Sequence, residues 1–345
     1  MKECGSVVIL SGAKNLNLGY EIGSNKLRFA GKQGESNISL KRIAVDSDDL
    51  RLYGVSVSAW QSISSHTQFC AVIGNPIAHS LSPAIHNAAF QSLGLDFIYL
   101  AFRVEDVKGT LAGVRALDNF RGLSVTIPHK IEAMKYVDEI ADVDRSIGAI
   151  NTVIHEKDKL IGLGTDGPGA LKALADAGVE ADGKNVLMLG SGGAARAIAF
   201  TLARNTKLSE LSILDINEKM LQELSADLQS GTDAAVKAAL LTDKSLAAAV
   251  ASADLIIHCT PVGMYPNEDA SLVPAELLRP EQVVFDIVYT PLETQLLANA
   301  RSRGCAVIPG VEMFINQAAL QFEHFTGVDA PVEVMRRVVM EHLQS

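Results

Sequence analysis

The most informative stretch of the chain is Asn185-Val-Leu-Met-Leu-Gly-Ser-Gly-Gly-Ala-Ala-Arg-Ala-Ile-Ala-Phe200. Its apolar run Val186 to Leu189 predicts a strand buried on both faces, and Ala194 begins a run of good helix formers. The glycines between the two predict a tight turn where the backbone can approach a pyrophosphate. The helix that follows offers free N–H groups and its positive dipole end to the phosphates. This turn is predicted to bind the cofactor through Gly190, Ser191, Gly192, Gly193, Ala194, Ala195 and Arg196.

A second strand is predicted at Leu211-Ser-Ile-Leu214 and ends at Asp215, about 25 residues after Gly190. An acidic residue at that distance is placed to accept hydrogen bonds from a ribose hydroxyl pair. The whole pattern predicts a Rossmann-type domain that binds NAD or NADP. Asp215 favours NAD, because the 2′-phosphate of NADP would bring like charge beside its carboxylate. Arg196 is the residue in the turn that could offset this charge.

Length and composition exclude several classes of protein. The chain has 345 residues, 48% hydrophobic and 20% charged, which predicts a globular protein with two domains. A net charge of −10 without a basic run argues against nucleic acid and anionic membranes as partners. Four cysteines without a C-x-x-C pair argue against a disulfide framework and a zinc site. With no membrane-length apolar run and no secretory signal, we expect a cytoplasmic monomer or homodimer that binds a small molecule.

Alternating strands and helices predict an α/β fold with mostly parallel sheets. Residues 1–66 contain polar stretches and one strand-like run, Ser6–Leu10, so we expect an extension without a recognisable motif. The glycine-rich run Gly162–Gly169 marks the expected domain junction. The predicted division has an open α/β substrate-binding catalytic domain, a Rossmann dinucleotide-binding domain and a cleft between them. Their residues are 67–165 with 311–345, and 166–310.

The predicted elements outside the Rossmann turn follow the hydrophobic pattern. Before the junction, strands are expected at Phe69–Ile73, Phe97–Phe102, Gly122–Ile127 and Ala149–Ile154, and helices at Lys108–Ala116 and Lys130–Val143. Ser82 and Pro83 are expected to be the N-cap and first residue of a further helix. Later strands are expected at Leu255–Cys259, Val283–Ile287 and Ala306–Ile308, and helices at Lys219–Leu228, Val311–Phe325 and Val332–Leu343.

Two serines come directly after the first of these strands, in the sequence His79-Ser80-Leu81-Ser82. Open α/β sheets bind ligands at the carboxyl ends of their strands. Two hydroxyls beside a helix N-terminus would hold a carboxylate there. The alternative is that Ser82 only caps the helix and Ser80 is a solvated turn residue.

A lysine and an aspartate form a second candidate group. Lys130 ends the run Ser124-Val-Thr-Ile-Pro-His-Lys130 and is expected at the start of a helix, where the dipole disfavours a cation. Such a misplaced charge indicates function, and the alternative is a surface lysine with its head in water. A pair with Asp166 could give or take the proton when an alcohol carbon loses hydride. The alternatives for Asp166 are a turn residue or an N-cap, and neighbouring His129 is assigned no role.

Taken together, these motifs resemble those of the shikimate dehydrogenases, and the resemblance covers about residues 68–345. In the family's order they are Gly74–Asn87 (GNPIAHSLSPAIHN), Ser124–Lys130 (SVTIPHK), Gly148–Thr152 (GAINT), Thr165–Gly167 (TDG), Gly190–Arg196 (GSGGAAR), Thr260–Met264 (TPVGM), Phe285–Pro291 (FDIVYTP) and Gly310–Gln317 (GVEMFINQ). The second and seventh motifs are most similar to the dehydrogenase half of fused dehydroquinate dehydratase–shikimate dehydrogenases. The family's split substrate domain, to which the chain returns after Gly310, is also expected.

The resemblance implies reversible reduction of the C3 ketone of 3-dehydroshikimate to shikimate, by hydride from NAD(P)H, in aromatic amino-acid (chorismate) biosynthesis. It implies that Lys130 and Asp166 are the catalytic pair. It assigns the substrate carboxylate to Ser80 and Ser82, and the ring hydroxyls to Thr126, Asn151, Tyr289 and Gln317. To the cofactor it assigns the turn 190–196 together with Asp215, Thr260, Ile287 and Gly310, and it implies no metal.

Two residues depart from the family's pattern. Gly164 stands where the family usually has Asn before Thr-Asp, which removes hydrogen bonds near Asp166. Asp215 stands where NADP-using members usually carry Asn-Arg-Thr. The alternatives are a quinate/shikimate dehydrogenase and a non-catalytic ligand-sensing paralogue. A methylenetetrahydrofolate dehydrogenase-like enzyme would share the architecture but should lack the paired serines. Shikimate is expected over quinate, because the paired serines leave no evident place for the extra hydroxyl of quinate.

Overall fold

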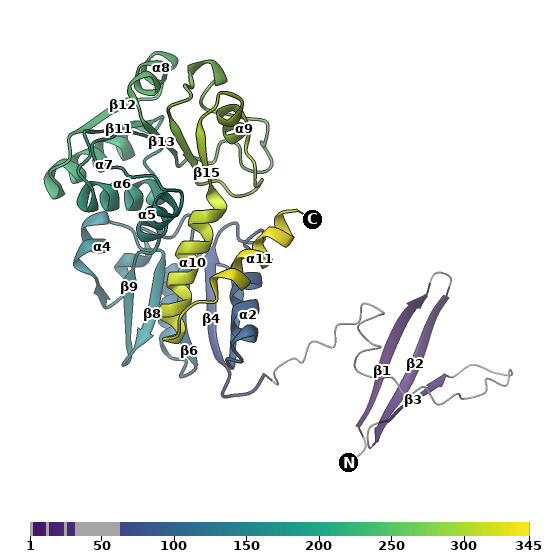
Figure 1. The fold of residues 1–345 in the computed structure, drawn as a ribbon. Helices are drawn as coiled ribbons and strands as arrows, with labels where there is room; N and C mark the ends of the chain where they lie inside the picture. The colour runs from purple at the N-terminus through teal and green to yellow at the C-terminus, as the bar shows by residue number, and fades with distance from the viewer. Residues whose placement is uncertain (1–2, 12–13, 24–25, 32–62, 345) are drawn as a thin grey trace. The chain divides into compact units, whose positions relative to one another are not determined.

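The computed structural model describes residues 3–11, 14–23, 26–31 and 63–344 (Figure 1). The chain divides into two compact units, Met1–Ile63 and Ser64–Ser345. In the first unit, an antiparallel sheet has the order β1-β2-β3, with β1 (Glu3–Ser11), β2 (Lys14–Gly23) and β3 (Lys26–Gly31). The predicted strand Ser6–Leu10 lies inside β1, whereas the sequence pattern does not predict β2 and β3. Most of the predicted extension 1–66 beyond β3, residues 32–62, lies outside the described residues.

The second unit begins with a mixed sheet of order β5-β4-β6-β8-β9-β7. Its strands are β4 (Gln68–Gly74), β5 (Phe97–Arg103), β6 (Phe120–Val125), β7 (Glu139–Ile140), β8 (Thr152–Glu156) and β9 (Lys159–Leu163). β4 is parallel to β5 and β6, but β8 runs antiparallel to both β6 and β9. The parallel pairing of β4 with β6 places the residues that follow these two strands at one edge of the sheet.

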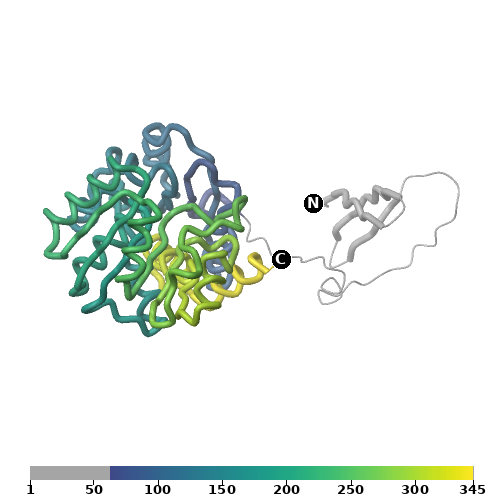
Figure 2. The backbone as a smooth tube through the Cα atoms, turned by 90° about the horizontal axis from the view of Figure 1, so that it is seen from above, coloured from purple at the N-terminus to yellow at the C-terminus, as the bar shows by residue number. Residues whose placement is uncertain are grey.

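Helices from both ends of the second unit pack on this sheet. They are α2 (Ser82–Ser92), α3 (Val107–Arg115), α10 (Gly310–Thr326) and α11 (Val332–Leu343), with a 3₁₀ turn η1 (Ala133–Lys135). Helix α4 (Asp142–Ile147) instead contacts α6 (Gly193–Asn205) and α7 (Glu218–Gly231). α10 contacts β6 and β8, and α11 contacts α2, so the C-terminal segment lies beside the start of the unit (yellow and blue in Figure 2). Phe90, Tyr99, Phe322 and Phe325 lie together in the core between them and are at most 1% exposed.

The second sheet is entirely parallel, with the order β12-β11-β10-β13-β14-β15. Its strands are β10 (Asn185–Leu189), β11 (Glu210–Asp215), β12 (Val236–Leu240), β13 (Leu255–His258), β14 (Val283–Asp286) and β15 (Ala306–Pro309). The connecting helices are α5 (Asp166–Asp176), α6 (Gly193–Asn205), α7 (Glu218–Gly231), α8 (Asp243–Ser252) and α9 (Gln295–Ser302), with a 3₁₀ turn η2 (Ala275–Leu277). Val186 to Leu189 are at most 1% exposed, which confirms the predicted strand. The strand order reverses beside β10, where Rossmann sheets bind dinucleotides.

The predicted helix Lys130–Val143 is wrong. The segment instead forms η1 and then β7, which pairs in parallel with β9. Asp138 stabilises this path through two interactions. Its Oδ2 accepts a hydrogen bond from the backbone N–H of Leu160 at 2.8 Å, and its carboxylate forms an ion pair with Arg115. Lys130 therefore lies in a loop and not at the start of a helix.

None of the helices among residues 3–11, 14–23, 26–31 and 63–344 is both long and apolar enough to cross a membrane.

Candidate active site

Lys130 and Asp166 form an ion pair at the edge of the first sheet. Lys130 follows β6 through a short loop, and Asp166 is the first residue of α5, whose N-cap is Thr165. Lys130 Nζ donates to Asp166 Oδ2, and the two side chains are 15% and 9% exposed. The two side chains are in contact, as predicted. Asp166 is neither a turn residue nor the N-cap of α5.

Asn151 orients the aspartate of this pair. Its Oδ1 accepts the backbone N–H of Thr165 at 2.7 Å, and its Nδ2 donates to Asp166 Oδ1 at 2.8 Å. A backbone N–H can pair only with the amide oxygen, so the orientation of this amide is fixed. Gln317 Oε1 lies 3.5 Å from the same Nδ2. The structure therefore brings four of the predicted site residues together: Lys130, Asp166, Asn151 and Gln317.

Ser80 and Ser82 lie together at the start of α2, although Ser82 is not the predicted N-cap. The N-cap is Leu81, and no side chain caps this helix. The backbone N–H of Ser82 instead donates to Ser80 Oγ at 3.3 Å. Ser82 is buried. Of the two predicted serines, Ser80 is the more accessible one.

Tyr289 and Thr126 lie on two further segments of the predicted site. The Tyr289 ring stacks on Phe314 of α10, with centroids 4.5 Å apart, and burial raises the pKa of its hydroxyl. Gln317 Nε2 donates to the Phe314 carbonyl at 2.9 Å, which links the predicted substrate residues Tyr289 and Gln317 through α10. Thr126 follows β6 directly and packs against Gly74, where a Cβ would lie 2.5 Å from Thr126 Cγ2.

The glycine-rich turn reaches the ion pair. A Cβ at Gly193 would lie 3.4 Å from Lys130 Cδ, so the start of α6 packs against the lysine. Gly190 has φ +109°, a conformation that glycine adopts without strain. α6 begins after Gly192 without a side-chain cap, and an uncapped helix N-terminus suits a phosphate. The turn therefore fits the pyrophosphate of a dinucleotide next to Lys130.

Asp215 ends β11 and supports this turn. Its Oδ2 accepts both the backbone N–H and the hydroxyl of Ser191, at 2.6 and 2.7 Å. Its Oδ1 accepts the backbone N–H of Asn217 at 2.8 Å. Arg196 pairs with Asp227 of α7 and donates to the Ile147 carbonyl at 2.7 Å. The Arg196 guanidinium, which the sequence suggests as a counter-charge for a 2′-phosphate, is therefore already paired within the protein.

A buried polar chain supports Thr260, and the sequence did not reveal it. His258 Nε2 lies 2.6 Å from Thr260 Oγ1, and His258 Nδ1 lies 2.8 Å from Asp286 Oδ1. Asp286 also accepts the hydroxyl of Thr294 at 2.7 Å, and His258 and Asp286 are at most 1% exposed. His258 and Asp286 lie opposite each other on the paired strands β13 and β14. Their contact can be predicted only when the pairing of these strands is known.

A second polar chain ties α10 to the first sheet. Ser124 Oγ donates to Gln321 Oε1 at 2.6 Å, and Gln321 Nε2 donates to the Asn151 carbonyl at 3.1 Å. Gln321 is 2% exposed and lies one helical turn after Gln317. The i, i+4 spacing of the two glutamines is the signal that could have revealed Gln321.

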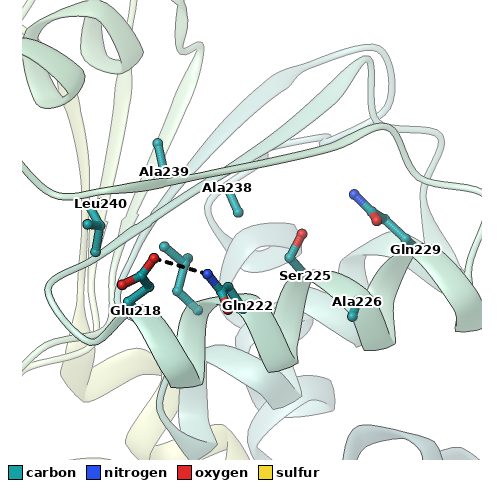
Figure 3. Close-up of a pocket in the computed structure, with 9 residues that line it drawn as sticks. Glu218, Gln222, Ser225, Ala226, Gln229, Ala238, Ala239 and Leu240 are labelled. Atoms are coloured by element: carbon teal, nitrogen blue, oxygen red, sulfur yellow. Dashed lines mark hydrogen bonds between the residues drawn. The ribbon is translucent and has the colours of Figure 1, made fainter.

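A separate shallow pocket lies between α7 and β12 (Figure 3). Its lining residues are Glu218, Leu221, Gln222, Ser225, Ala226, Gln229, Ala238, Ala239 and Leu240. None of the predicted site residues is among them. The predicted residues instead meet around Lys130 and Asp166, which is the candidate active site.

Gly310 illustrates a glycine that the fold itself requires. It begins α10, and a Cβ there would lie 2.4 Å from the Val288 carbonyl oxygen and 2.5 Å from that of Ile287. Gly310→Ala is therefore expected to lower the free energy of unfolding by about 1–3 kcal/mol, as overpacking does. Gly113→Ala is the control, because Gly113 is in α3 with nothing near its missing Cβ. Thermal denaturation compares them, and an unchanged Tm for Gly310→Ala contradicts the prediction.

Comparison with known proteins identifies the family. Residues 72–153 match the shikimate dehydrogenase substrate-binding domain, and residues 310–340 match the shikimate 5′-dehydrogenase C-terminal domain. A shikimate dehydrogenase (NADP(+)) of Moorella thermoacetica is 42% identical over 281 residues, 81% of this chain and 95% of the relative. The Pyrococcus abyssi enzyme of the same name is 44% identical over 272 residues, 79% of this chain and 97% of the relative.

A solved structure agrees with these relatives. A shikimate 5-dehydrogenase from Listeria monocytogenes, in complex with shikimate and NAD, has a TM-score of 0.75 and 37% identity. The match covers 81% of this chain and 98% of that protein. By sequence and by structure, this chain belongs to the shikimate dehydrogenase family.

Proposed function

We propose that this chain reversibly reduces the C3 ketone of 3-dehydroshikimate to shikimate with a reduced nicotinamide cofactor. The observation that carries the proposal is the Lys130–Asp166 ion pair packed against the glycine-rich turn, in a chain with these relatives. The reaction converts 3-dehydroshikimate, NAD(P)H and one proton into shikimate and NAD(P)⁺. The first sheet with α10 and α11 would bind substrate (67–165 and 311–345), and residues 166–310 would bind the cofactor.

The ion pair supplies the proton chemistry of the proposed reaction. When bound, the cofactor supplies hydride to C3, and negative charge then develops on the former carbonyl oxygen. The Lys130 ammonium can stabilise this charge and donate its proton, acting as an electrostatic group and a general acid. Asp166 holds the ammonium in place through Oδ2, while Asn151 holds Oδ1. In the reverse direction the same pair takes the proton from the alcohol.

The remaining predicted residues would bind and orient the substrate. Ser80 and Ser82, beside the N-terminus of α2, would hold its carboxylate. Ring hydroxyls would be contacted by Thr126, Asn151, Tyr289 and Gln317. Two of these residues support this proposal by their contacts: Asn151 donates to Asp166 of the ion pair, and Gln317 Oε1 lies 3.5 Å from Asn151 Nδ2.

We propose that Asp215 makes the chain prefer NAD, although both relatives are named for NADP(+). The two oxygens of Asp215 are fixed on the turn and on Asn217, so the carboxylate cannot easily turn away from a 2′-phosphate. At about 4 Å and an effective dielectric of 20, two unit charges repel by about 4 kcal/mol before screening. Arg196, paired with Asp227, is not available to offset this repulsion.

Asp215→Asn is expected to raise kcat/KM for NADP relative to NAD by roughly 10-fold or more, since it removes a unit of repelling charge. Initial rates with both cofactors measure the ratio. Glu218→Gln is the control, because Glu218 lies nearby but bonds with Gln222 instead of the turn. If the unsubstituted chain preferred NADP, Asp215 would not select the cofactor. The same conclusion would follow if Asp215→Asn and Glu218→Gln changed the NADP/NAD ratio of kcat/KM equally.

The proposed function is tested with the purified full chain, 3-dehydroshikimate and each reduced cofactor, followed by nicotinamide absorbance. We expect turnover with 3-dehydroshikimate and slower turnover with 3-dehydroquinate. Binding of substrate without turnover with either cofactor would overturn the proposal and favour a ligand-sensing protein.

A further inference from the structure

We infer that Asp144 is a positioning residue for Asp166 and acts through the backbone of Gly164. Gly164 follows β9 directly and lies two residues before Asp166. A Cβ at Gly164 would lie 2.6 Å from Asp144 Oδ1 and 3.5 Å from its Cγ. The Asp144 carboxylate, from α4, therefore occupies the space that any side chain at position 164 would need.

The surroundings of Asp144 show what holds the carboxylate there. It is 4% exposed, and burial raises its pKa to about 6. A hydrogen bond with the Gly164 backbone and the nearby Arg204 guanidinium both lower that pKa. A buried carboxylate is costly without nearby positive charge, and Arg204, which donates to the carbonyl of the adjacent Val143 at 3.2 Å, supplies such charge.

The loop before Asp166 is held through three consecutive backbone groups. The Leu163 carbonyl accepts the Asn151 N–H at 3.3 Å, and the Thr165 N–H donates to Asn151 Oδ1 at 2.7 Å. Between them, the Asp144 carboxylate lies against the Gly164 backbone, with Oδ1 2.6 Å from the position that a Cβ would take. Asn151 also donates to Asp166, so a shift of the loop would change the position of Asp166 as well.

This arrangement accounts for the glycine at position 164. Position 164 has no side chain, where family members usually carry Asn. The Asp144 carboxylate of α4 fills the space that a side chain at this position would take. Asp144 thus provides from a different element the polar contact that steadies the loop. The inference rests on the proposed function, because only that function gives Asp166 its role.

The test combines Gly164→Ala, Asp144→Ala and the double variant, with Asp144→Asn as the conservative change. Gly164→Ala brings a methyl group against the Asp144 carboxylate, and displacement of a catalytic group by about 1 Å can cost about 10²-fold in rate. We expect kcat to fall by roughly 10–10²-fold in Gly164→Ala. The double variant should lose no more kcat than Asp144→Ala alone, because no carboxylate then opposes the new methyl group. Asp144→Asn keeps an acceptor oxygen and should retain more kcat than Asp144→Ala.

The readouts separate positioning from folding. KM for 3-dehydroshikimate should change little, because Ser80 and Ser82 are untouched, and circular dichroism melts report the folded fraction of each variant. The inference would be overturned if the effects of Gly164→Ala and Asp144→Ala on kcat simply multiplied in the double variant. It would also be overturned if the variants lost Tm without losing kcat. If the unsubstituted chain does not turn over, the proposed function fails. The Asp144–Gly164 contact is then judged by whether the two changes couple in Tm.

Discussion

Lys130→Met is expected to lower kcat about 10²–10⁴-fold while KM for 3-dehydroshikimate changes much less. Methionine retains the length of the side chain but removes the ammonium that pairs with Asp166 Oδ2. The developing negative charge on the substrate oxygen then has neither a counter-charge nor a proton donor. Steady-state kinetics with the preferred cofactor measure both constants.

The matched control for this variant is Lys159→Met. Lys159 also pairs with a carboxylate, that of Glu139, but the two side chains are 56% and 52% exposed. Exposed pairs of this kind contribute little, so kcat should remain close to that of the unsubstituted chain. If Lys130→Met raised only KM, Lys130 would be a binding residue, and the proposed acid–base role would be wrong.

The largest expected effect on stability is that of Asp286→Ala. Asp286 is 0% exposed and accepts bonds from His258, Thr294 and the Val288 backbone N–H. Removing the carboxylate leaves these three buried donors unsatisfied, each at a cost of about 1–3 kcal/mol, so a loss of about 3–5 kcal/mol is expected after partial relaxation. For a domain of this size, each kcal/mol lowers Tm by roughly 2–4 °C, so a fall of about 10 °C is expected.

Glu293→Ala provides the comparison for Asp286. Glu293 pairs with Arg301 on the surface, with side chains 57% and 59% exposed, and its removal should change stability by less than about 0.5 kcal/mol. Asp286→Asn keeps the shape and one acceptor oxygen and should fall between the two. A similar Tm for Asp286→Ala and Glu293→Ala would show that the His258–Asp286 pair does not stabilise the fold.

The parts of the fold predicted correctly are those encoded in local pattern. The buried run Val186–Leu189, the glycine-rich turn after it and the strand ending at Asp215 are each marked by their own residues, apolar runs for the strands and glycines for the turn. The helix Val332–Leu343 is found with identical bounds, because its apolar residues recur at helical spacing. Lys130 is selected because the pattern predicts a cation at a helix start, where the dipole disfavours it. The structure has a loop there, so this reason does not hold, although Lys130 does pair with Asp166.

The parts that were wrong or missed depend on partners far away in sequence. Asp138 turns the expected helix after Lys130 into a short strand by bonding with Leu160 across the sheet edge. β12 (Val236–Leu240, VKAAL) was not predicted because its alanines favour a helix and its apolar residues do not alternate with polar ones. Asp144 becomes relevant only once the fold places it against Gly164. Such contacts are set by strand pairing, which a single sequence does not specify.

The central claim is that hydride passes directly to C3 of the substrate next to Lys130. Cofactor deuterated at the transferred position of its reduced nicotinamide, incubated with 3-dehydroshikimate and the full chain, tests it in one measurement. The account predicts shikimate with one deuterium at C3, seen by mass spectrometry and NMR, and loss of this product in Lys130→Met. Unlabelled shikimate, or no shikimate with either cofactor, would contradict it.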